Sequence, residues 1–266
     1  MDTLRISSTQ NPRIKHLMAL RQKAQMRRSE QRIVVEGARE LRHCINAGFK
    51  VETVIYCPDI FDISTLPVTA CEVVEVTSQV YEKIAYRGST EGVMAIVEPR
   101  QMTLSDIILG DKPLIVVLEG VEKPGNIGAV LRSADAAHAT AVIVCDPLTD
   151  LYNPNLIRSS IGAIFTVPCV ACSSDECISF LKENNINILT AQLQDSEPYY
   201  NTPMQGPTAI VMGTEATGLT NAWREAATAH IRIPMQGQLD SLNVSVSTAI
   251  LLFEAVRQRV TSMQNA

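Results

Sequence analysis

Three loops of the chain combine glycine, amide and acidic side chains in ways that suit ligand binding. The first, residues 119–128, reads EGVEKPGNIG and leads into a helical pattern that carries Arg132. The second, residues 213–220, reads GTEATGLT and holds Glu215 between two glycines. The third, residues 233–247, reads IPMQGQLDSLNVSVS and precedes a long apolar helical pattern. Glycines let a ligand approach the backbone closely, and a helix N-terminus offers free N–H groups.

Each of these residues also has a purely structural interpretation. Gly125 and Asn126 are expected to form a turn, with Asn126 capping the next helix. Ser241 is a good N-cap for the last helix, and Glu215 suits the positive end of a helix dipole. Arg132 lies in an otherwise apolar helix, where it either extends to solvent or serves a site.

The loops lack the motifs of two common nucleotide-binding classes. Gly213 and Gly218 have the spacing of half a phosphate-binding loop, but Leu219 and Thr220 stand where Lys and Ser or Thr are required. No GxGxxG segment follows any predicted strand. These observations argue against a nucleotide-dependent ligase and against a dehydrogenase.

The three loops follow strands of one predicted parallel sheet. In the second half of the chain apolar strands alternate with helices, which indicates a parallel sheet covered on both faces. The predicted strands are residues 114–118, 142–145, 167–170, 186–189, 209–212 and 231–233, and the predicted helices are 127–137, 155–164 and 243–260. Ligands of such sheets bind at the carboxyl ends of the strands, so the loops are expected to lie together.

The first hundred residues predict a smaller α/β domain. A basic, helix-prone segment covers residues 12–30. The strands expected after it are residues 33–35, 51–56, 73–76 and 93–97, and the helices are 38–47 and 80–85. A linker near residues 99–102 separates this pattern from the next, which predicts domains at residues 1–100 and 110–266.

Positive charge is concentrated at the N-terminus. Residues 1–50 contain eleven Lys and Arg against four acidic residues, a net charge of +7, whereas the rest of the chain carries −12. A basic block on an acidic body indicates local contact with a polyanion, although a solvated helix face has the same pattern. No series of aromatic residues marks a stacking platform for single-stranded bases, so contact with a polyanion would not rest on base stacking.

The seven cysteines and the N-terminus favour a cytoplasmic protein with reduced thiols. The first residues lack the apolar core of a secretory signal, and no apolar run approaches the roughly 18 residues of a membrane span. Cys169, Cys172 and Cys177 lie close together, but no second pair follows them and the first belongs to a predicted buried strand. We therefore predict no metal and no membrane association.

The three loops resemble the three motifs of the SpoU/TrmH branch of the SPOUT RNA methyltransferases. All three occur in the family's order across residues 113–260. The matching segments are PGNIGAVLR with Asn126 and Arg132, VMGTEATGL with Gly213 and Glu215, and IPMQGQLDSLNVSVSTAILLFEA with Ile233, Ser241, Leu242 and Asn243. Two departures are Lys123, where small or acidic residues are frequent, and Thr248, where alanine is more usual.

The resemblance implies an α/β fold with two domains. The N-terminal part is similar to the family's L30e-like substrate-binding domain through residues 8–15 (STQNPRIK) and 33–37 (IVVEG). Residues 152–155 (YNPN) and 158–162 (RSSIG) also fit the family pattern. The C-terminal domain is expected to contain a deep trefoil knot made by the second and third motifs, which periodicity would not predict because knots are rare.

The resemblance also implies a cofactor and an assembly. S-adenosyl-L-methionine is expected to bind in the knot, largely through the backbone of Gly213, Ile233 and Leu242. A homodimer is expected, with Asn126 and Arg132 near the subunit interface. The reaction implied is methylation of a ribose 2′-hydroxyl in structured RNA.

The implied chemistry suits these residue types. A sulfonium methyl donor is already a strong electrophile, so the protein must align the reactants and help to remove the ribose proton. Arg132 is expected at the 2′-oxygen, where the family assigns it the role of base. A guanidinium with a pKa above ~12 is a poor base. It can more easily stabilise the developing 2′-oxyanion and hold a neighbouring phosphate. The sequence does not distinguish the two roles. Asn126, Glu215, Ser241 and Asn243 are expected to orient Arg132, the ribose or the donor.

The RNA substrate is the least determined part of this prediction. The additional N-terminal domain resembles that of relatives acting on large-subunit ribosomal RNA, which favours 23S rRNA over tRNA. A tRNA methyltransferase and a catalytically silent RNA-binding relative are the alternatives.

Overall fold

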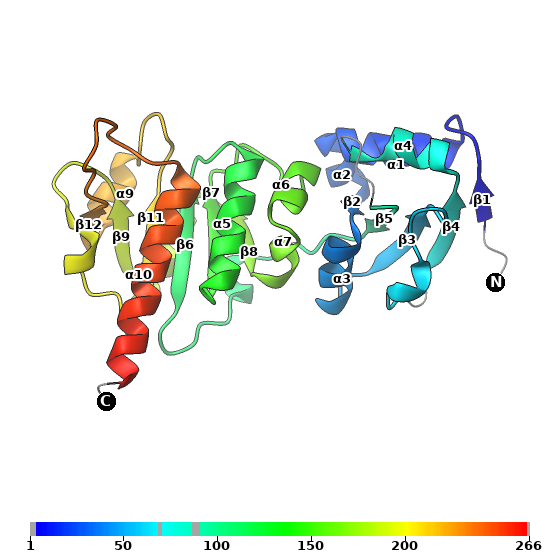
Figure 1. Ribbon diagram of the computed structural model, residues 1–266. Helices are drawn as coiled ribbons and strands as arrows, with labels where there is room; N and C mark the ends of the chain where they lie inside the picture. The colour runs from blue at the N-terminus through cyan, green and yellow to red at the C-terminus, as the bar shows by residue number, and fades with distance from the viewer. Residues whose placement is uncertain (1–3, 69–70, 87–90, 265–266) are drawn as a thin grey trace. The chain divides into compact units, whose positions relative to one another are not determined.

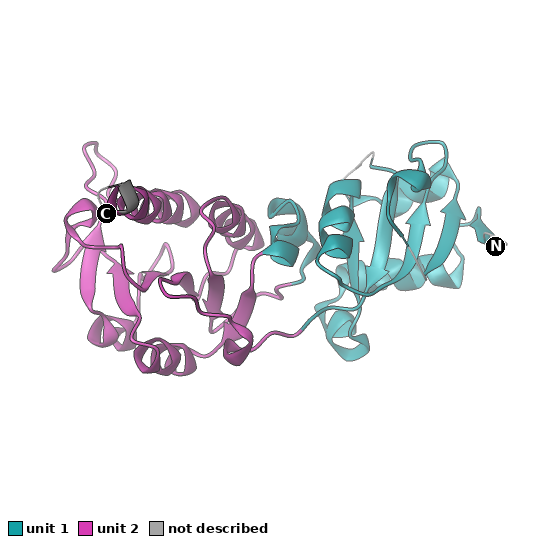
Figure 2. Cartoon of the chain, turned by 90° about the horizontal axis from the view of Figure 1, so that it is seen from below, with its two compact units in different colours: residues 1–100, 152–166 teal, residues 101–151, 167–266 magenta. Residues whose placement is uncertain are grey.

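A computed structural model describes residues 4–68, 71–86 and 91–264. Contacts within the chain divide it into two units (Figure 2). Unit 1 comprises residues 1–100 and 152–166, and unit 2 comprises residues 101–151 and 167–266. Residues 152–166, which the sequence places in the second domain, thus pack with the first. The proposed boundary near residue 100 coincides with the end of the first segment of unit 1.

Unit 1 is built on a mixed five-stranded sheet with the order β1-β4-β3-β5-β2 (Figure 1). The strands are β1 (Leu4–Ile6), β2 (Ile33–Glu36), β3 (Val51–Tyr56), β4 (Glu72–Val76) and β5 (Val93–Val97). The helices are α1 (Pro12–Gln22), α2 (Ala24–Glu30), α3 (Ala38–Asn46), α4 (Ser78–Ile84), α6 (Pro154–Ser159) and α7 (Ala163–Thr166). Ile14, Leu17 and Leu20 of α1 are buried in a core with residues of β3 and β4, so the apolar face of the basic helix holds it on the unit.

The helix predicted at residues 155–164 is two short helices in the structure. Ile161 and Gly162 have φ values of 50° and 90°, in the left-handed region that an α-helix cannot continue through. A Cβ at Gly162 would lie 3.0 Å from the His43 ring and 3.3 Å from the Glu40 backbone, so close packing requires glycine there. The break therefore separates α6 from α7 at this contact.

Unit 2 contains a seven-stranded sheet in which all pairs are parallel, as predicted, with the order β10-β12-β9-β11-β6-β7-β8. The strands are β6 (Leu114–Glu119), β7 (Ala141–Cys145), β8 (Cys169–Cys172), β9 (Asn187–Ala191), β10 (Glu197–Pro198), β11 (Thr208–Met212) and β12 (Ala229–Arg232). The central strands β6, β7 and β11 are buried along their whole length, which explains their continuous apolar sequences.

Helices cover both faces of this sheet (Figure 2). One face carries α5 (Pro124–Ala136) and α10 (Val244–Gln264), which pack against each other. The opposite face carries α8 (Ser174–Glu183) and α9 (Asn221–Ala226), and buries Trp223 and Leu181 against the strands. The α/β fold and its parallel sheet are confirmed, whereas the trefoil knot stays a prediction.

Candidate functional site

The carboxyl ends of the strands of unit 2 border a cavity of about 440 Å³, here called the larger cavity. Its lining comes from the segments after β9, β11 and β12 and from the start of α10. The sequence indicated the segments after β11 and β12, because they carry the second and third loops. Residues 191–194 after β9 were missed, since AQLQ carries no glycine or acidic signal.

The three residues predicted to bind the cofactor all line the larger cavity: Gly213, Ile233 and Leu242. Gly213 is required by packing, because a Cβ there would lie 2.4 Å from the carbonyl carbon of Gly218. The loop folds back at this point, and Thr214 and Gly218 exchange two backbone hydrogen bonds of 3.1 and 3.2 Å. A tight loop is thereby presented to the cavity with its backbone close to any occupant.

Residues of this loop also line a smaller cavity of about 320 Å³. Residues 120–123, which follow β6, line it together with Asn126 of α5. Residues 213–217 and Val244 line both cavities, and we call this segment with Val244 the shared wall. The two cavities are therefore adjacent.

A polar cluster forms at the shared wall from residues that are distant in sequence. The Glu215 carboxylate accepts hydrogen bonds from Asn243 Nδ2 at 2.8 Å and from Asn126 Nδ2 at 3.2 Å. Asn243 Nδ2 also donates to Asn126 Oδ1 at 3.2 Å, and Lys123 Nζ lies 3.3 Å from Glu215. The ammonium of Lys123, followed by the Asn126 and Val244 hydrogen bonds, holds the pKa of Glu215 below its usual value. The structure thus brings together three of the five residues predicted to be catalytic.

The position of Asn126 differs from the prediction that it caps its helix. Pro124 is the first residue of α5, where its missing N–H costs nothing, and Lys123 occupies the cap position without a side-chain hydrogen bond. Gly125 and Asn126 lie in the first helical turn and do not form a separate turn. The Asn126 amide is thereby free to contact Glu215.

Asn243, not Ser241, caps α10. Its Oδ1 accepts from the Ser245 N–H at 3.0 Å and from the Ser245 hydroxyl at 2.6 Å, so its Nδ2 donors face the polar cluster. Ser241 is exposed, lines the larger cavity and donates to Asp240 at 3.1 Å. The cap was misplaced because α10 begins at Val244, three residues beyond Ser241.

Arg132 lies apart from the polar cluster. It is exposed on α5, six residues after Asn126, and lines neither cavity of unit 2. It forms no hydrogen bond or ion pair with any residue that the structure describes. Within one chain its guanidinium is therefore free to contact another molecule.

Two residues that support the site were not recognised from the sequence. Glu119, the last residue of β6, is buried and accepts from the Thr220 N–H at 2.9 Å and from the Thr220 hydroxyl at 2.7 Å. This contact holds the end of the 213–219 loop to β6. Lys123 was noted as a departure from the family, and its contact with Glu215 gives it a place in the polar cluster.

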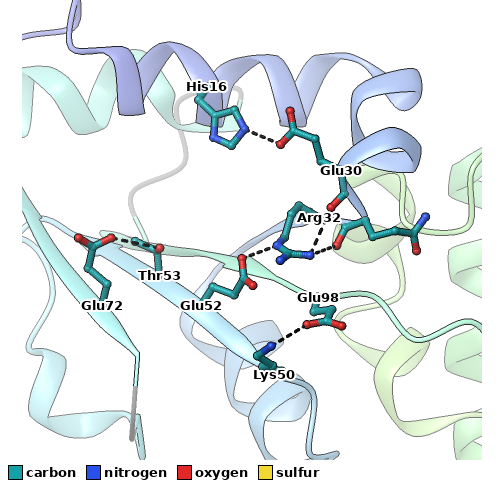
Figure 3. A network of polar contacts seen from close by, with 9 residues as sticks. His16, Glu30, Arg32, Lys50, Glu52, Thr53, Glu72 and Glu98 are labelled. Atoms are coloured by element: carbon teal, nitrogen blue, oxygen red, sulfur yellow. Dashed lines mark hydrogen bonds and ion pairs between the residues drawn. The ribbon is translucent and has the colours of Figure 1, made fainter.

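Most of the basic residues of unit 1 are already paired (Figure 3). Lys50 and Glu98 form an ion pair of 3.0 Å, and Arg32 pairs with Glu52. The other side-chain partners are Glu72 for Arg13, Glu40 for Arg39, and backbone carbonyl oxygens for Arg21, Arg27 and Arg42. Within the basic block of residues 1–50, four exposed residues have no such partner among the described residues: Arg5, Lys15, Lys23 and Arg28. Outside the block, Lys83 of α4 is also exposed without such a partner. The basic block is thus reduced to four cations available to a polyanion.

None of the helices in the described ranges is long and apolar enough to cross a membrane.

Comparisons with known proteins match both parts of the chain. Residues 113–253 match the model of the SpoU rRNA Methylase family, and residues 11–95 match that of the MRM3-like substrate binding domain. The chain is 40% identical over 175 residues to the 23S rRNA (guanosine-2′-O-)-methyltransferase RlmB of Salmonella typhi, covering 64% of this chain and 72% of that protein.

Solved structures resemble the whole chain. A crystal structure of an RNA 2′-O ribose methyltransferase has a TM-score of 0.86 and 40% identity, covering 97% of this chain and 100% of the other. An AdoMet-bound rRNA methyltransferase from Sinorhizobium meliloti has a TM-score of 0.88 and 29% identity, covering 96% and 98% of the two chains. These similarities extend over both units.

Proposed function

Because the chain belongs to the SpoU rRNA Methylase family, we propose that it transfers a methyl group from S-adenosyl-L-methionine to the 2′-hydroxyl of a guanosine ribose in 23S rRNA. The observation that carries the proposal is the pair of adjacent cavities that are both lined by the shared wall. Methyl transfer needs a donor and an acceptor held in line and in direct contact, and two adjacent cavities that share lining residues suit this need.

The larger cavity suits the methyl donor. Its volume of about 440 Å³ lies within the ordinary range for small-molecule sites of roughly 300–1,000 Å³. Apolar side chains such as Met212 and Leu251 line it together with polar ones such as Gln192. Gly213, Ile233 and Leu242 would hold the donor largely through their backbone groups. Bound there, S-adenosyl-L-methionine supplies an electrophilic methyl group on a positively charged sulfur.

The polar cluster would orient the acceptor ribose in the smaller cavity. Glu215 is held in its ionised form, and Lys123 still has two N–H donors beyond the one directed at Glu215. Asn126 and Asn243 donate to Oε1 of this carboxylate, whereas Lys123 donates to Oε2. Ser241, on the wall of the larger cavity, would contact the donor.

Arg132 would act from a second copy of the chain. The exposed face of α10 carries Val246, Phe253 and Val260 at intervals of seven residues, each about half exposed, and α10 packs on α5. Intervals of seven place these side chains in one apolar stripe along the helix, which suits burial against an identical stripe. In such a homodimer, the partner's Arg132 would reach the 2′-oxygen, stabilise its developing negative charge and hold a neighbouring phosphate.

Unit 1 would provide contacts to the RNA. The four available cations, Arg5, Lys15, Lys23 and Arg28, would bind phosphates without reading bases. Because the proposed substrate is ribosomal RNA, we place the protein in the cytoplasm.

The test is transfer of labelled methyl from S-adenosyl-L-methionine to unmodified 23S rRNA and to bulk tRNA, followed by nucleoside mass spectrometry. We expect 2′-O-methylguanosine from 23S rRNA alone. The same product from tRNA alone would overturn the substrate, and a base-methylated product would overturn the reaction. Tight donor binding without transfer to either RNA would favour a silent RNA-binding relative.

A further inference from the structure

A cluster of three cysteines lies at the same edge of the sheet, outside the two cavities. Cys145 ends β7 and Cys172 ends β8, and the two are directly paired in the register of these parallel strands. Cys177 reaches them from α8, and the three Sγ atoms all lie within 4.8 Å of one another. In the sequence, Cys169 lies close to Cys172 and Cys177, and no metal was predicted there; in the structure Cys145 takes the place of Cys169 in the cluster.

We propose that Cys145, Cys172 and Cys177 bind a thiophilic metal ion such as Zn²⁺. Three sulfur ligands about 2.3 Å from one zinc ion lie roughly 3.8 Å from one another in tetrahedral geometry. The observed cluster would therefore need to contract by at most about 1 Å. A disulfide requires two sulfurs to approach to about 2.05 Å, which is a larger movement.

The surroundings of the cluster provide the other features that a site needs. Cys145 and Cys177 are fully buried, which shields bound metal, whereas Cys172 is only partly buried and leaves a path for the ion and for a water molecule as fourth ligand. Binding forms three zinc–sulfur bonds and releases the three thiol protons to solvent. Soft thiolate ligands favour Zn²⁺ or Cu⁺ over Mg²⁺ or Ca²⁺.

The only tryptophan of the chain is placed to report on this site. Trp223 of α9 is fully buried, and its Nε1 donates to the Ser174 hydroxyl at 2.9 Å. That hydroxyl donates in turn to Asp146, the residue after Cys145, at 2.6 Å. Contraction of the cluster would therefore alter the environment of the indole ring.

The test is titration of the reduced full-length protein with Co²⁺, followed by competition with Zn²⁺. We expect one equivalent to produce thiolate-to-cobalt charge-transfer absorption and a change in Trp223 fluorescence, with Zn²⁺ removing the absorption. Cys172→Ser should weaken binding by at least about tenfold. Cys169→Ser is the matched control, because Cys169 lies on the same strand but outside the cluster, and it should bind as the unmodified protein does.

A second measurement does not depend on the folding of a variant. In the unmodified protein, Zn²⁺ should protect Cys172, the one partly buried member of the cluster, from alkylation as mapped by mass spectrometry, and should not protect the partly buried Cys169. The proposal is overturned if Co²⁺ gives no charge-transfer absorption, if Cys172→Ser binds normally, or if Cys169→Ser loses binding equally. A disulfide formed within the cluster by hydrogen peroxide, in a protein that binds neither metal, would replace the metal site with a redox site.

Discussion

The polar network of unit 1 and the polar cluster of unit 2 contain similar residue types but differ in how completely they are paired. In unit 1, Arg32 and Lys50 each face a carboxylate in a one-to-one ion pair (Figure 3). In unit 2, Glu215 faces one ammonium and two neutral amides, which retain hydrogen-bonding capacity.

Cavity volume does not distinguish these two regions. The cavity beside the unit 1 network measures about 490 Å³, more than either cavity of unit 2. Its charged lining residues, among them Arg13, Glu52 and Glu72, are already engaged in ion pairs. Exposed ion pairs of this kind contribute little to stability and leave little for a ligand. Unused donors and acceptors are therefore a better guide to a functional site than volume.

The largest expected effect comes from removing Arg132, the exposed and unpaired arginine of α5. Arg132→Ala should lower methyl transfer by about 10³-fold, because the developing oxyanion loses its cation, and should leave donor affinity nearly unchanged. Single-turnover transfer and calorimetric binding of S-adenosyl-L-methionine measure the two quantities. Arg32→Ala, in a paired position of unit 1, is the control and should transfer normally. Equal losses in both variants would remove the distinction between the two regions.

Neutralising the carboxylate of the polar cluster should have the next largest effect. Glu215→Gln keeps the shape but places an amide against the donors of Asn126 and Asn243, and misplacing the ribose should slow transfer by about 10²-fold. The matched change in unit 1 is Glu72→Gln, which removes an exposed ion pair with Arg13 and should not alter transfer. Normal turnover by Glu215→Gln would contradict the role given to the cluster.

Within unit 1, we expect cations without an ion-pair partner to contribute more to RNA binding than cations that are already paired. Changing Arg5, Lys15, Lys23 and Arg28 together to Ala should weaken binding of 23S rRNA fragments by about tenfold or more at low salt. The slope of log affinity against log salt should fall by roughly one for each phosphate that the protein no longer neutralises. Changing Arg13, Arg32 and Lys50 together to Ala is the control. If the control weakened RNA binding as much, pairing would not predict which cations are used.

The smallest expected effect concerns pH. Lys123 is the main reason that the pKa of Glu215 is low, so Lys123→Ala should let that pKa rise toward its ordinary value of 4.5. The carboxylate is the active form, and activity is lost as pH falls through the pKa. The acid limb of the pH profile should therefore move to higher pH, with little change at neutral pH. An unmoved acid limb would show that Glu215 does not set it.

The extent to which the sequence predicted the structure differs between these regions. Apolar strands such as β6 and β11 were predicted nearly to the residue, because they are buried on both faces. Asn126 lies 89 positions from Glu215, and Asn243 lies 28 positions from it, so no local pattern indicates that they are in contact. These three residues were selected only because of the family resemblance. Helix α8 was not predicted, although Ser173 and Glu176 form a capping box at its start.

The errors also have physical causes. The break at Ile161 and Gly162 depends on packing against His43, which no local pattern reveals. Spacing along the chain groups Cys169 with Cys172 and Cys177, whereas the pairing of β7 with β8 places Cys145 beside Cys172.

The shared wall has a thermodynamic consequence for both ligands. If donor binding in one cavity shifts residues 213–217, it changes the affinity of the other cavity for RNA, and linkage requires RNA to change donor affinity by the same factor. A loop that lines both cavities would thus make the affinity of each site depend on whether the other is occupied. The affinity of the protein for RNA would then differ before and after the donor is consumed.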